Sequence, residues 1–349
     1  MTTPPSPKRL GFFSRILDQA DAAERYRLAT AQIVQAESCG FDSAWIAQHH
    51  FHEAESGLPA PFVFLAHVAA HTSRIRLGTG IVTLPLELPV RVAEDASVLD
   101  LMCDGRLEVG VGPGGNLTAF TAFGLDSADR HTLFDRNLDL LRTAWTGGPL
   151  PGGDRLYPIN PRLVDRIWQA TFSVEGARRA GVAGDGLMLS RTQPRAPDAP
   201  HASLADIQNP MLDAYLAALP KGYAPRILAS RTVFVADDRK DARRFAEIGL
   251  PRLSDKRASM GSPAPKGSVD DLIAAFDVHL GTPADVIESL MVDDTLTRAT
   301  DLVVQVHSID PPHPFILRSI ELMAEKVAPA FGWVPPQMEG KKWLKQKRM

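Results

Sequence analysis

Two adjacent histidines are the side chains of this sequence best suited to moving a proton. His49 and His50 follow Gln48 at the end of an apolar segment, residues 41–47, that is typical of a buried β-strand. A neutral imidazole, whose pKa is ordinarily about 6.5, can accept or release a proton near neutral pH. Neighbouring residues of a strand point to opposite sides, so we expect one of the two rings to face a cavity at the strand end.

The same segment contains further potential metal ligands, because His52 and Glu53 follow closely. Two histidines that bind one metal from a helix are usually spaced i, i+4, and this order lacks that spacing. The sequence has two cysteines, Cys39 and Cys103, and they form no Cys/His cluster that would complete a site. We therefore predict no metal site, and reduced thiols at both cysteines.

A glycine-rich segment, residues 110–115, directly follows another strand-like segment, residues 106–111. Its spacing matches the G-x-G-x-x-G fingerprint of dinucleotide-binding folds. That fingerprint belongs to the first strand–helix unit of its fold, however, and Pro113 removes one amide donor from the loop. We favour the alternative that Gly112 and Gly114 let the backbone approach a flat ring or its side chain.

Ser173 is a natural N-cap for a helix expected over residues 173–183, with Val174 and Gly176 in its first turn. Free amides and the positive end of the helix dipole make such a turn an anion site. The segment therefore indicates a binding site for phosphate. A plain N-cap without a ligand is the alternative.

The elements that must position these residues alternate regularly. Apolar segments typical of strands buried on both faces recur along the chain, and amphipathic helices separate them. The eight expected strands cover residues 9–13, 41–47, 75–84, 106–111, 166–172, 186–190, 226–235 and 301–307. This alternation predicts a single (β/α)8 barrel, a TIM barrel, over residues 8–335.

Two long segments interrupt the alternation. Residues 191–210 follow the sixth expected strand, and residues 250–268, rich in Ser, Lys and Pro, follow the seventh. Loops that leave the C-termini of barrel strands build the active-site face, so both segments are candidate lids or, alternatively, surface decoration. Residues 336–349 form a basic tail that we expect to be solvated.

The sequence resembles the bacterial luciferase-like family of flavin-dependent monooxygenases over roughly residues 8–335. The motifs that carry the resemblance are Gly78-Thr79-Gly80-Ile81-Val82-Thr83-Leu84-Pro85, Pro89, Ala93-Glu94-Asp95, Leu99-Asp100 and Gly105-Arg106, with further matches from Gly40-Phe41-Asp42 through Gln48-His49-His50-Phe51 and from Ser173 through Gly186.

The resemblance implies roles for these residues. It makes His49 the catalytic residue, although Gln48 stands where the family has a glutamate before the histidine pair. It implies that Thr79, Gly80 and Ile81 form a non-prolyl cis bulge behind the flavin ring, and that Ser173 binds the phosphate of FMN. The family often has an arginine where Pro113 stands, and Arg191 is our candidate to replace that cation.

The resemblance also implies the reaction. Reduced FMN would serve as co-substrate with O₂, a flavin 4a-hydroperoxide would form in a dry pocket, and one oxygen atom would pass to a small organic substrate. A separate flavin reductase and a homodimer are further implications. The alternatives are a deazaflavin-dependent oxidoreductase that transfers hydride on the same barrel, and a flavin-binding relative without catalytic activity.

Composition excludes several other classes of function. The 349 residues are 44% hydrophobic and 23% charged, which is ordinary for a globular protein with a sizeable core. A net charge of -3 gives no electrostatic case for nucleic acid or an anionic membrane as partner. The segment Met1–Lys8 has no apolar signal core, so we predict a cytoplasmic protein.

Overall fold

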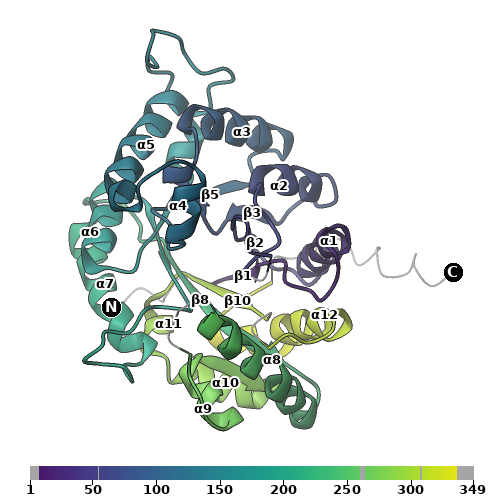
Figure 1. Ribbon diagram of the computed structural model, residues 1–349. Helices are drawn as coiled ribbons and strands as arrows, with labels where there is room; N and C mark the ends of the chain where they lie inside the picture. Colours follow the sequence, from purple (N-terminus) through teal and green to yellow (C-terminus); the bar gives the residue numbers. More distant parts are fainter. Residues whose placement is uncertain (1–7, 54, 260–263, 307–308, 336–349) are drawn as a thin grey trace, which may run out of the picture.

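A closed ring of parallel strands forms the centre of the computed structural model, which describes residues 8–53, 55–259, 264–306 and 309–335. Figure 1 views this ring with the helices arranged around it. The hydrogen-bonded order is β10-β1-β2-β3-β5-β6-β7-β8, and pairing of β10 with β8 closes the ring. The predicted (β/α)8 barrel is therefore confirmed.

The strands are β1 (Arg9–Ser14), β2 (Ser43–Ile46), β3 (Arg76–Thr79), β4 (Val82–Thr83), β5 (Leu107–Gly112), β6 (Ile167–Ala170), β7 (Gly186–Leu189), β8 (Ile227–Val235), β9 (Val278–Gly281) and β10 (Asp301–Gln305). The helices are α1 (Ala22–Ser38), α2 (Pro61–Ala69), α3 (Pro89–Met102), α4 (Leu117–Ala122), α5 (Arg130–Trp145), α6 (Val174–Ala183), α7 (Leu204–Ala218), α8 (Arg239–Ser259), α9 (Val269–Ala275), α10 (Pro283–Met291), α11 (Asp294–Arg298) and α12 (His313–Leu322).

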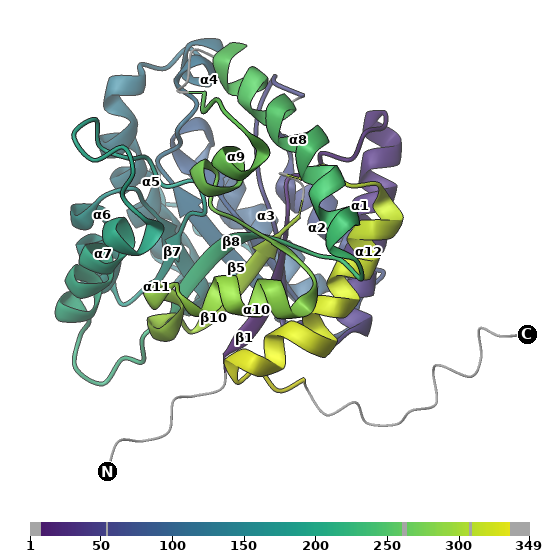
Figure 2. The same cartoon turned by 90° about the horizontal axis from the view of Figure 1, so that it is seen from below.

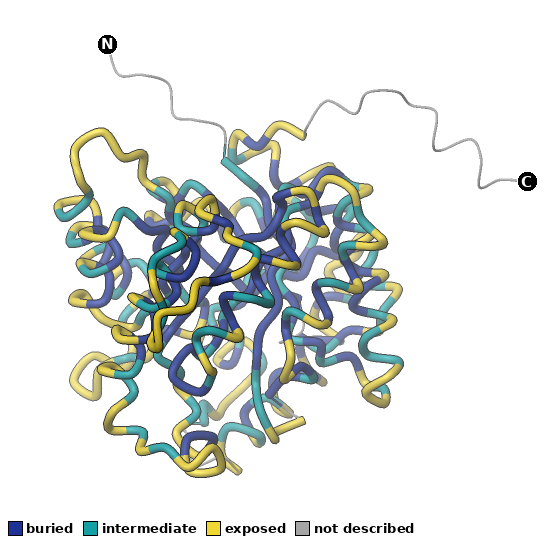
Figure 3. Tube along the Cα trace, turned by 90° about the horizontal axis from the view of Figure 1, so that it is seen from above, coloured by how far each residue is buried: buried dark blue, intermediate teal, exposed yellow. Residues whose placement is uncertain are grey.

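Two layers of apolar side chains hold the barrel together. The larger layer lies between the outer faces of the strands and the surrounding helices. In Figure 3 the stretches of the trace coloured as buried gather in the middle of the molecule. The smaller layer fills the barrel interior with Trp45, Trp168, Met188, Leu228 and Val303. The rings of Trp45 and Trp168 meet edge to face with their centroids 5.6 Å apart.

Glycines on neighbouring strands make room for the two tryptophans. A Cβ atom on Gly78 would lie 2.2 Å from the Trp45 ring, and one on Gly186 would lie 2.2 Å from the Trp168 ring. The indole Nε1 of Trp168 donates a hydrogen bond to Glu108 over 2.8 Å. The barrel interior is thus a packed core rather than a channel.

The structure corrects the expected elements in three places. The segment 75–84 is two short strands, β3 and β4, because the chain turns out of the ring between them. Residues 250–259 are the last part of α8 rather than a loop, and α9 and β9 follow. The loop after β7 is shorter than expected, because Ser203 caps α7 with a capping box and Pro210 lies inside that helix.

Candidate active site

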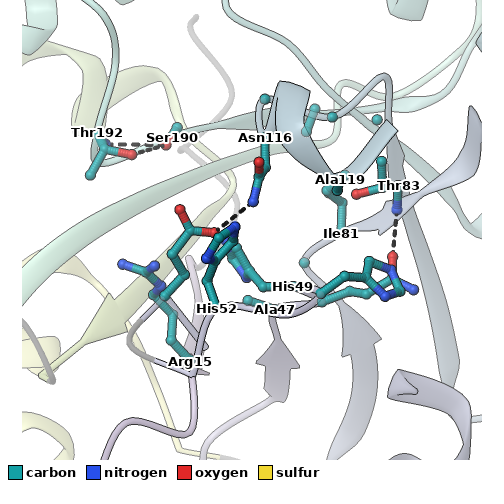
Figure 4. A pocket seen from close by; sticks show the side chains of 18 of the residues that line it. Arg15, Ala47, His49, His52, Ile81, Thr83, Asn116, Ala119, Ser190 and Thr192 are labelled. Atoms are coloured by element: carbon teal, nitrogen blue, oxygen red, sulfur yellow. Dashed lines mark hydrogen bonds between the residues drawn. The ribbon is translucent and has the colours of Figure 1, made fainter. Parts of the chain in front are cut away.

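A cavity of about 1070 Å³ opens at the C-terminal ends of the barrel strands. Its walls come from the loops after β1, β2, β3, β5, β6 and β7, from α4, from the last turns of α8, and from residues of β8 and β10. Figure 2 shows α4 and α9 above this end of the barrel. The volume suits a flat cofactor together with a small substrate, and Figure 4 shows the cavity from close by.

One wall consists of backbone rather than side chains. It is formed by Gly80–Ile81 after β3 and by residues 112–115 at the end of β5, which we call the glycine cradle. The Gly80–Ile81 peptide bond is cis, in agreement with the bulge that the sequence motif implied. A Cβ on Gly114 would lie 2.5 Å from Thr83, and Gly114 has a φ of +82° that favours glycine. The cradle therefore brings backbone against any flat ring in the cavity.

Thr79 belongs to the barrel wall and not to the cavity lining. Its hydroxyl donates to the carbonyl oxygen of Gly110 over 2.8 Å and accepts from the Gly110 amide over 2.9 Å. These two bonds join β3 to β5 just where β3 leaves the ladder. Thr79 thus positions the cradle from behind, whereas the sequence had suggested that it contacts the cofactor.

Both histidines of the predicted pair line the cavity, although the expected strand alternation would have placed only one there. The reason is that β2 ends at Ile46, so the chain is no longer extended at His49 and His50. The Nδ1 atom of His49 and the Nε2 atom of His50 are buried and have no hydrogen-bond partner within the described parts of the chain. Each ring therefore has a buried nitrogen whose hydrogen-bonding capacity the described residues leave unused.

His49 is neutral at physiological pH. Burial lowers its pKa from 6.5 to about 3, and the nearby cations Arg15 and Lys256 add to the effect. Because Gln48 stands in place of the family's glutamate, the His49 ring was expected to be less basic than it would be next to a carboxylate, and the lowered pKa agrees with this direction. A neutral imidazole can donate from one nitrogen and accept at the other.

Gln48 does not orient the His49 ring. Its amide Nε2 donates to Glu87 over 2.6 Å. Its Oε1 accepts from the backbone N–H of Thr83 over 2.7 Å, the bond drawn at Thr83 in Figure 4. These bonds connect the loop after β2 to β4 and to the segment that follows β4. Gln48 therefore supports the cavity wall, and the residue that replaces the family's glutamate has a structural function here.

Ser173 caps α6 at the same end of the barrel as His49 and Gly80, but it does not line the cavity. Its hydroxyl accepts from the Gly176 amide over 3.1 Å, and Ser173 and Val174 are exposed to solvent. Thr171 and Phe172, the two residues directly before Ser173, do line the cavity. The anion site predicted at this turn thus lies just outside the cavity wall.

Arg191 lines the cavity and is 7% exposed. Its Nε donates to Gln305 of β10 over 2.8 Å, and its Nη1 donates to Thr232 of β8 over 3.2 Å. These bonds hold the guanidinium on the side of β7 that faces away from β6 and Ser173. No hydrogen bond or ion pair joins Arg191 to the turn of Ser173 within the described residues, and its role as the cation that replaces the family's arginine stays a prediction.

Two cationic side chains line the cavity that the sequence had not indicated as site residues. Arg15 follows the C-terminal end of β1, and Lys256 lies in α8. The signal that identified His49, a polar side chain just past a strand end, was also present for Arg15. Lys256 had no comparable signal, because its segment was expected to be a loop.

The described portion of the chain contains no cluster of three His, Cys, Asp or Glu side chains that could hold a metal ion. Cys39 and Cys103 are free cysteines. No described helix is both long and apolar enough to cross a membrane.

Comparison with known proteins identifies the family. The model of the luciferase-like monooxygenases matches residues 10–292, so the chain belongs to that family and is a monooxygenase by class. The 4-hydroxyprotoasukamycin monooxygenase of Streptomyces nodosus subsp. asukaensis is 28% identical over 335 residues, which cover 85% of this chain and 88% of that protein.

Solved structures agree with this assignment. Monooxygenase RslO1 from Streptomyces bottropensis matches with a TM-score of 0.74 and 26% identity, covering 93% of this chain and 99% of that one. The oxygenating constituent of 3,6-diketocamphane monooxygenase from Pseudomonas putida, solved with FMN, shares the fold with a TM-score of 0.73 and 20% identity, over 94% of this chain and all of that one. An F420-dependent secondary alcohol dehydrogenase also shares the fold, with a TM-score of 0.66, 18% identity and coverage of 93% and 99%.

Proposed function

We propose that this protein is an FMN-dependent monooxygenase that uses reduced flavin and O₂ to oxygenate a small organic substrate. The observation that carries the proposal is the pairing of the glycine cradle with the unpartnered Nδ1 of His49 in one cavity. The cradle offers close backbone approach to a flat ring, and His49 offers a polar atom beside it. When bound, reduced FMN would supply the electrons that activate O₂, through the flavin 4a-hydroperoxide that the family resemblance implies.

The residues of the chain would bind and shield the reacting groups. Gly80, Ile81, Gly112 and Gly114 would hold the ring against the β3–β5 wall. The neutral His49 would donate or accept a hydrogen bond, or transfer a proton, at the oxygen atom that reacts. The proposed phosphate contact is the turn of Ser173, Val174 and Gly176, where Ser173 and Val174 are exposed outside the cavity wall and Gly176 is buried behind them.

Oxygen consumption tests the proposal directly. The purified protein is supplied with FMN reduced by a separate flavin reductase and with a panel of aldehydes, ketones and organic acids, and both O₂ uptake and oxygenated product are measured. Product formed with FMN, and absent when either O₂ or reductase is omitted, supports the proposal. Product formation that requires deazaflavin and proceeds without O₂ would show the hydride-transfer alternative.

The non-catalytic alternative has its own outcome in this experiment. A flavin-binding relative without activity would bind FMN but would form no product from any substrate of the panel. The unpartnered nitrogens of His49 and His50 are compatible with a ligand in both cases, because buried polar atoms without a partner are costly, so product formation decides between the two.

We also propose that the protein forms a homodimer through α2 and α3. Several large apolar side chains of these helices are exposed to solvent: Val63, Val98, Leu101 and Met102. Exposed apolar patches of this kind often mark interfaces. Measurement of the molar mass in solution by light scattering, with Met102→Glu as the disrupting variant, tests the dimer.

A further inference from the structure

We propose that the substrate is an organic anion, and that Arg15, Arg191 and Lys256 form the subsite that binds its charged group. This inference rests on the proposed function, because it concerns the substrate of the same cavity. It is carried by the convergence of three cationic side chains, here called the cation cluster, on one side of the cavity. These residues come from parts of the chain that are far apart in sequence.

The cation cluster lies across the cavity from the glycine cradle. Arg15 follows β1, Arg191 follows β7, and Lys256 lies in α8, which follows β8. In the closed ring the strands β7, β8, β10 and β1 are consecutive, and they stand opposite β3 and β5, which carry the cradle. Figure 4 accordingly views Arg15 and Ile81 on opposite sides of His49. A group bound by the cluster would place the rest of its molecule between His49 and the cradle.

The cluster offers hydrogen-bond donors that the protein leaves unused. Across the described ranges, the side chains of Arg15 and Lys256 form no hydrogen bond and no ion pair, while Arg191 is held by Gln305 and Thr232. Gln305 uses its Oε1 for that bond, and its Nε2 is buried without a partner while the residue lines the cavity. Guanidinium, ammonium and amide N–H groups are all donors, so the group that satisfies them must be an acceptor.

Two carboxylates also line the cavity, and within the described residues neither forms an ion pair with the cluster, although Glu55 attracts both Arg15 and Lys256 at longer range. The side chain of Glu53 is 77% exposed and pairs with Arg25, which is not part of the lining. Glu55 is buried and accepts a hydrogen bond from Asn116 over 3.1 Å. No ion pair joins either carboxylate to Arg15, and the contribution of Glu55 is a longer-range attraction.

The electrostatics favour a bound anion. Burial lowers the pKa of Arg15 to about 10, that of Arg191 to about 9 and that of Lys256 to about 8. Repulsion from Arg15 adds to the effect at Arg191 and Lys256, and repulsion from Arg257 adds to it at Arg15 and Arg191. Like charges in a buried site disfavour one another, and an opposite charge within a few ångströms reverses that effect. A carboxylate, sulfonate or phosphate group would accept from several of these donors at once.

A titration of the FMN-loaded protein tests the subsite. Hexanesulfonate and hexanoate serve as anionic probes, hexanol is the neutral probe of the same length, and binding is measured by isothermal calorimetry. We expect both anions to bind at least about 10-fold more tightly than hexanol, and Arg15→Met and Lys256→Met each to weaken anion binding about 10- to 100-fold. Lys240→Met removes a charge from the exposed start of the same helix α8 and should leave binding unchanged.

The opposite results would overturn the subsite. One such result is that hexanol and the anions bind equally well, and another is that neither anion binds measurably. A third is that the Arg15 and Lys256 variants bind the anions as tightly as the wild type does. Far-ultraviolet circular dichroism and FMN affinity of each variant verify that the fold is retained.

The phosphate of FMN is the other possible source of the anion, and a second titration separates the two. FMN and riboflavin are titrated into flavin-free wild type, Arg15→Met and Lys256→Met. We expect the variants to bind FMN like the wild type. Weaker binding of FMN with unchanged binding of riboflavin would assign the cluster to the cofactor and overturn the proposal.

The titrations are independent of turnover. Failure of O₂ uptake with reduced FMN would therefore refute the proposed monooxygenase activity while the anion titration still reports on the subsite. Turnover of neutral members of the substrate panel at full rate, with acids untouched, would refute the subsite and leave the monooxygenase proposal standing.

Discussion

At the scale of single residues, the site is defined by polar atoms that the fold leaves without partners. His49, His50 and Gln305 each place an unpartnered, buried nitrogen at or near the cavity. Such atoms are costly in a folded protein, and a catalytic role or a bound partner is a reason that they are tolerated. The charged groups of Arg15 and Lys256 likewise have no hydrogen-bond or ion-pair partner within the described residues.

His49→Ala should slow product formation by about 10²- to 10⁴-fold, because loss of a group that donates or accepts a proton typically costs this much. The fold and the affinity for FMN should be largely retained, since the Nδ1 atom of His49 makes no hydrogen bond in the protein. Stopped-flow spectra of reduced flavin mixed with O₂ and substrate measure the step. His52→Ala, at an exposed ring near Thr118, is the control. Wild-type turnover by His49→Ala would make His49 structural.

The low pKa of His49 predicts a loss of stability in acid. The unfolded chain binds a proton at His49 below pH 6.5, whereas the folded protein resists protonation down to about pH 3. Stability therefore falls as the pH drops below about 6.5, and at pH 5 this one group costs about 2 kcal/mol. His49→Gln removes the effect. Urea unfolding at pH 7 and pH 5 should show a smaller loss for the variant, and equal losses would contradict the assignment.

Ser173→Ala should weaken FMN binding about 10- to 100-fold and leave riboflavin binding unchanged, because a hydroxyl-to-phosphate hydrogen bond is lost. The same change removes the N-cap of α6, which affects stability as well. Ser203→Ala is the matched control, since Ser203 caps α7 and lies outside the cavity lining. Equal FMN affinity in wild type and Ser173→Ala would leave Ser173 as a cap only.

At the scale of elements, the approach of β3 to β5 positions the cradle. Thr79 bonds to both backbone groups of Gly110, and the chain leaves the ladder at the next residue. The opposite wall depends on α8, whose last turns bring Lys256 and Ser259 to the cavity. The cradle thus depends on where β3 ends, and the opposite wall depends on where α8 ends.

Gly110→Ala should destabilise the protein by about 3 kcal/mol, because the added Cβ would lie 2.0 Å from the carbonyl oxygen of Thr79. Gly115→Ala is the matched control five residues later, where a Cβ would meet no atom within 4 Å. Denaturant unfolding of both variants measures the difference. Similar stabilities would show that β3 and β5 can move apart without cost.

At the scale of the whole molecule, closure of the barrel brings distant segments into one site. Pairing of β10 with both β1 and β8 completes the ring, with Val303 opposite Gly11 and Ser230. Arg231 of β8 is fully buried beside this closure, where it donates to Asp293 over 2.6 Å and to Gln208 of α7 over 2.9 Å. This ion pair joins the barrel to its outer helices.

Asp293→Asn should destabilise the protein by about 3–5 kcal/mol, because it leaves the Arg231 charge buried without its partner. Asp270→Asn removes one partner of the exposed pair with Arg243 and should leave the unfolding free energy unchanged within error. Thermal and urea unfolding compare the two. Equal effects would mean that Arg231 finds another counter-charge.

The sequence by itself determined that the fold is a (β/α)8 barrel. It also determined that the site lies at the C-terminal ends of the strands. Strands apolar on both faces can only be buried in a parallel sheet with helices outside, so the alternation defines the fold. Parallel strands also place every strand end on one face, which is why His49, Gly80 and Ser173 could be grouped in advance.

Only the tertiary structure decided which residues at the strand ends lie together in the cavity. It also decided how their pKa values are shifted. Arg15 and Lys256 are separated by most of the chain, and they lower the pKa of His49 because barrel closure brings them to the same cavity. The last part of α8 is a helix because Leu250 and Ser254 are buried against the barrel, whereas its Ser-, Lys- and Pro-rich sequence had indicated a loop. A short stretch of sequence shows the spacing of its apolar residues and the residues that favour turns. It does not show which distant segment will pack against it, and that packing decides which of its side chains are buried.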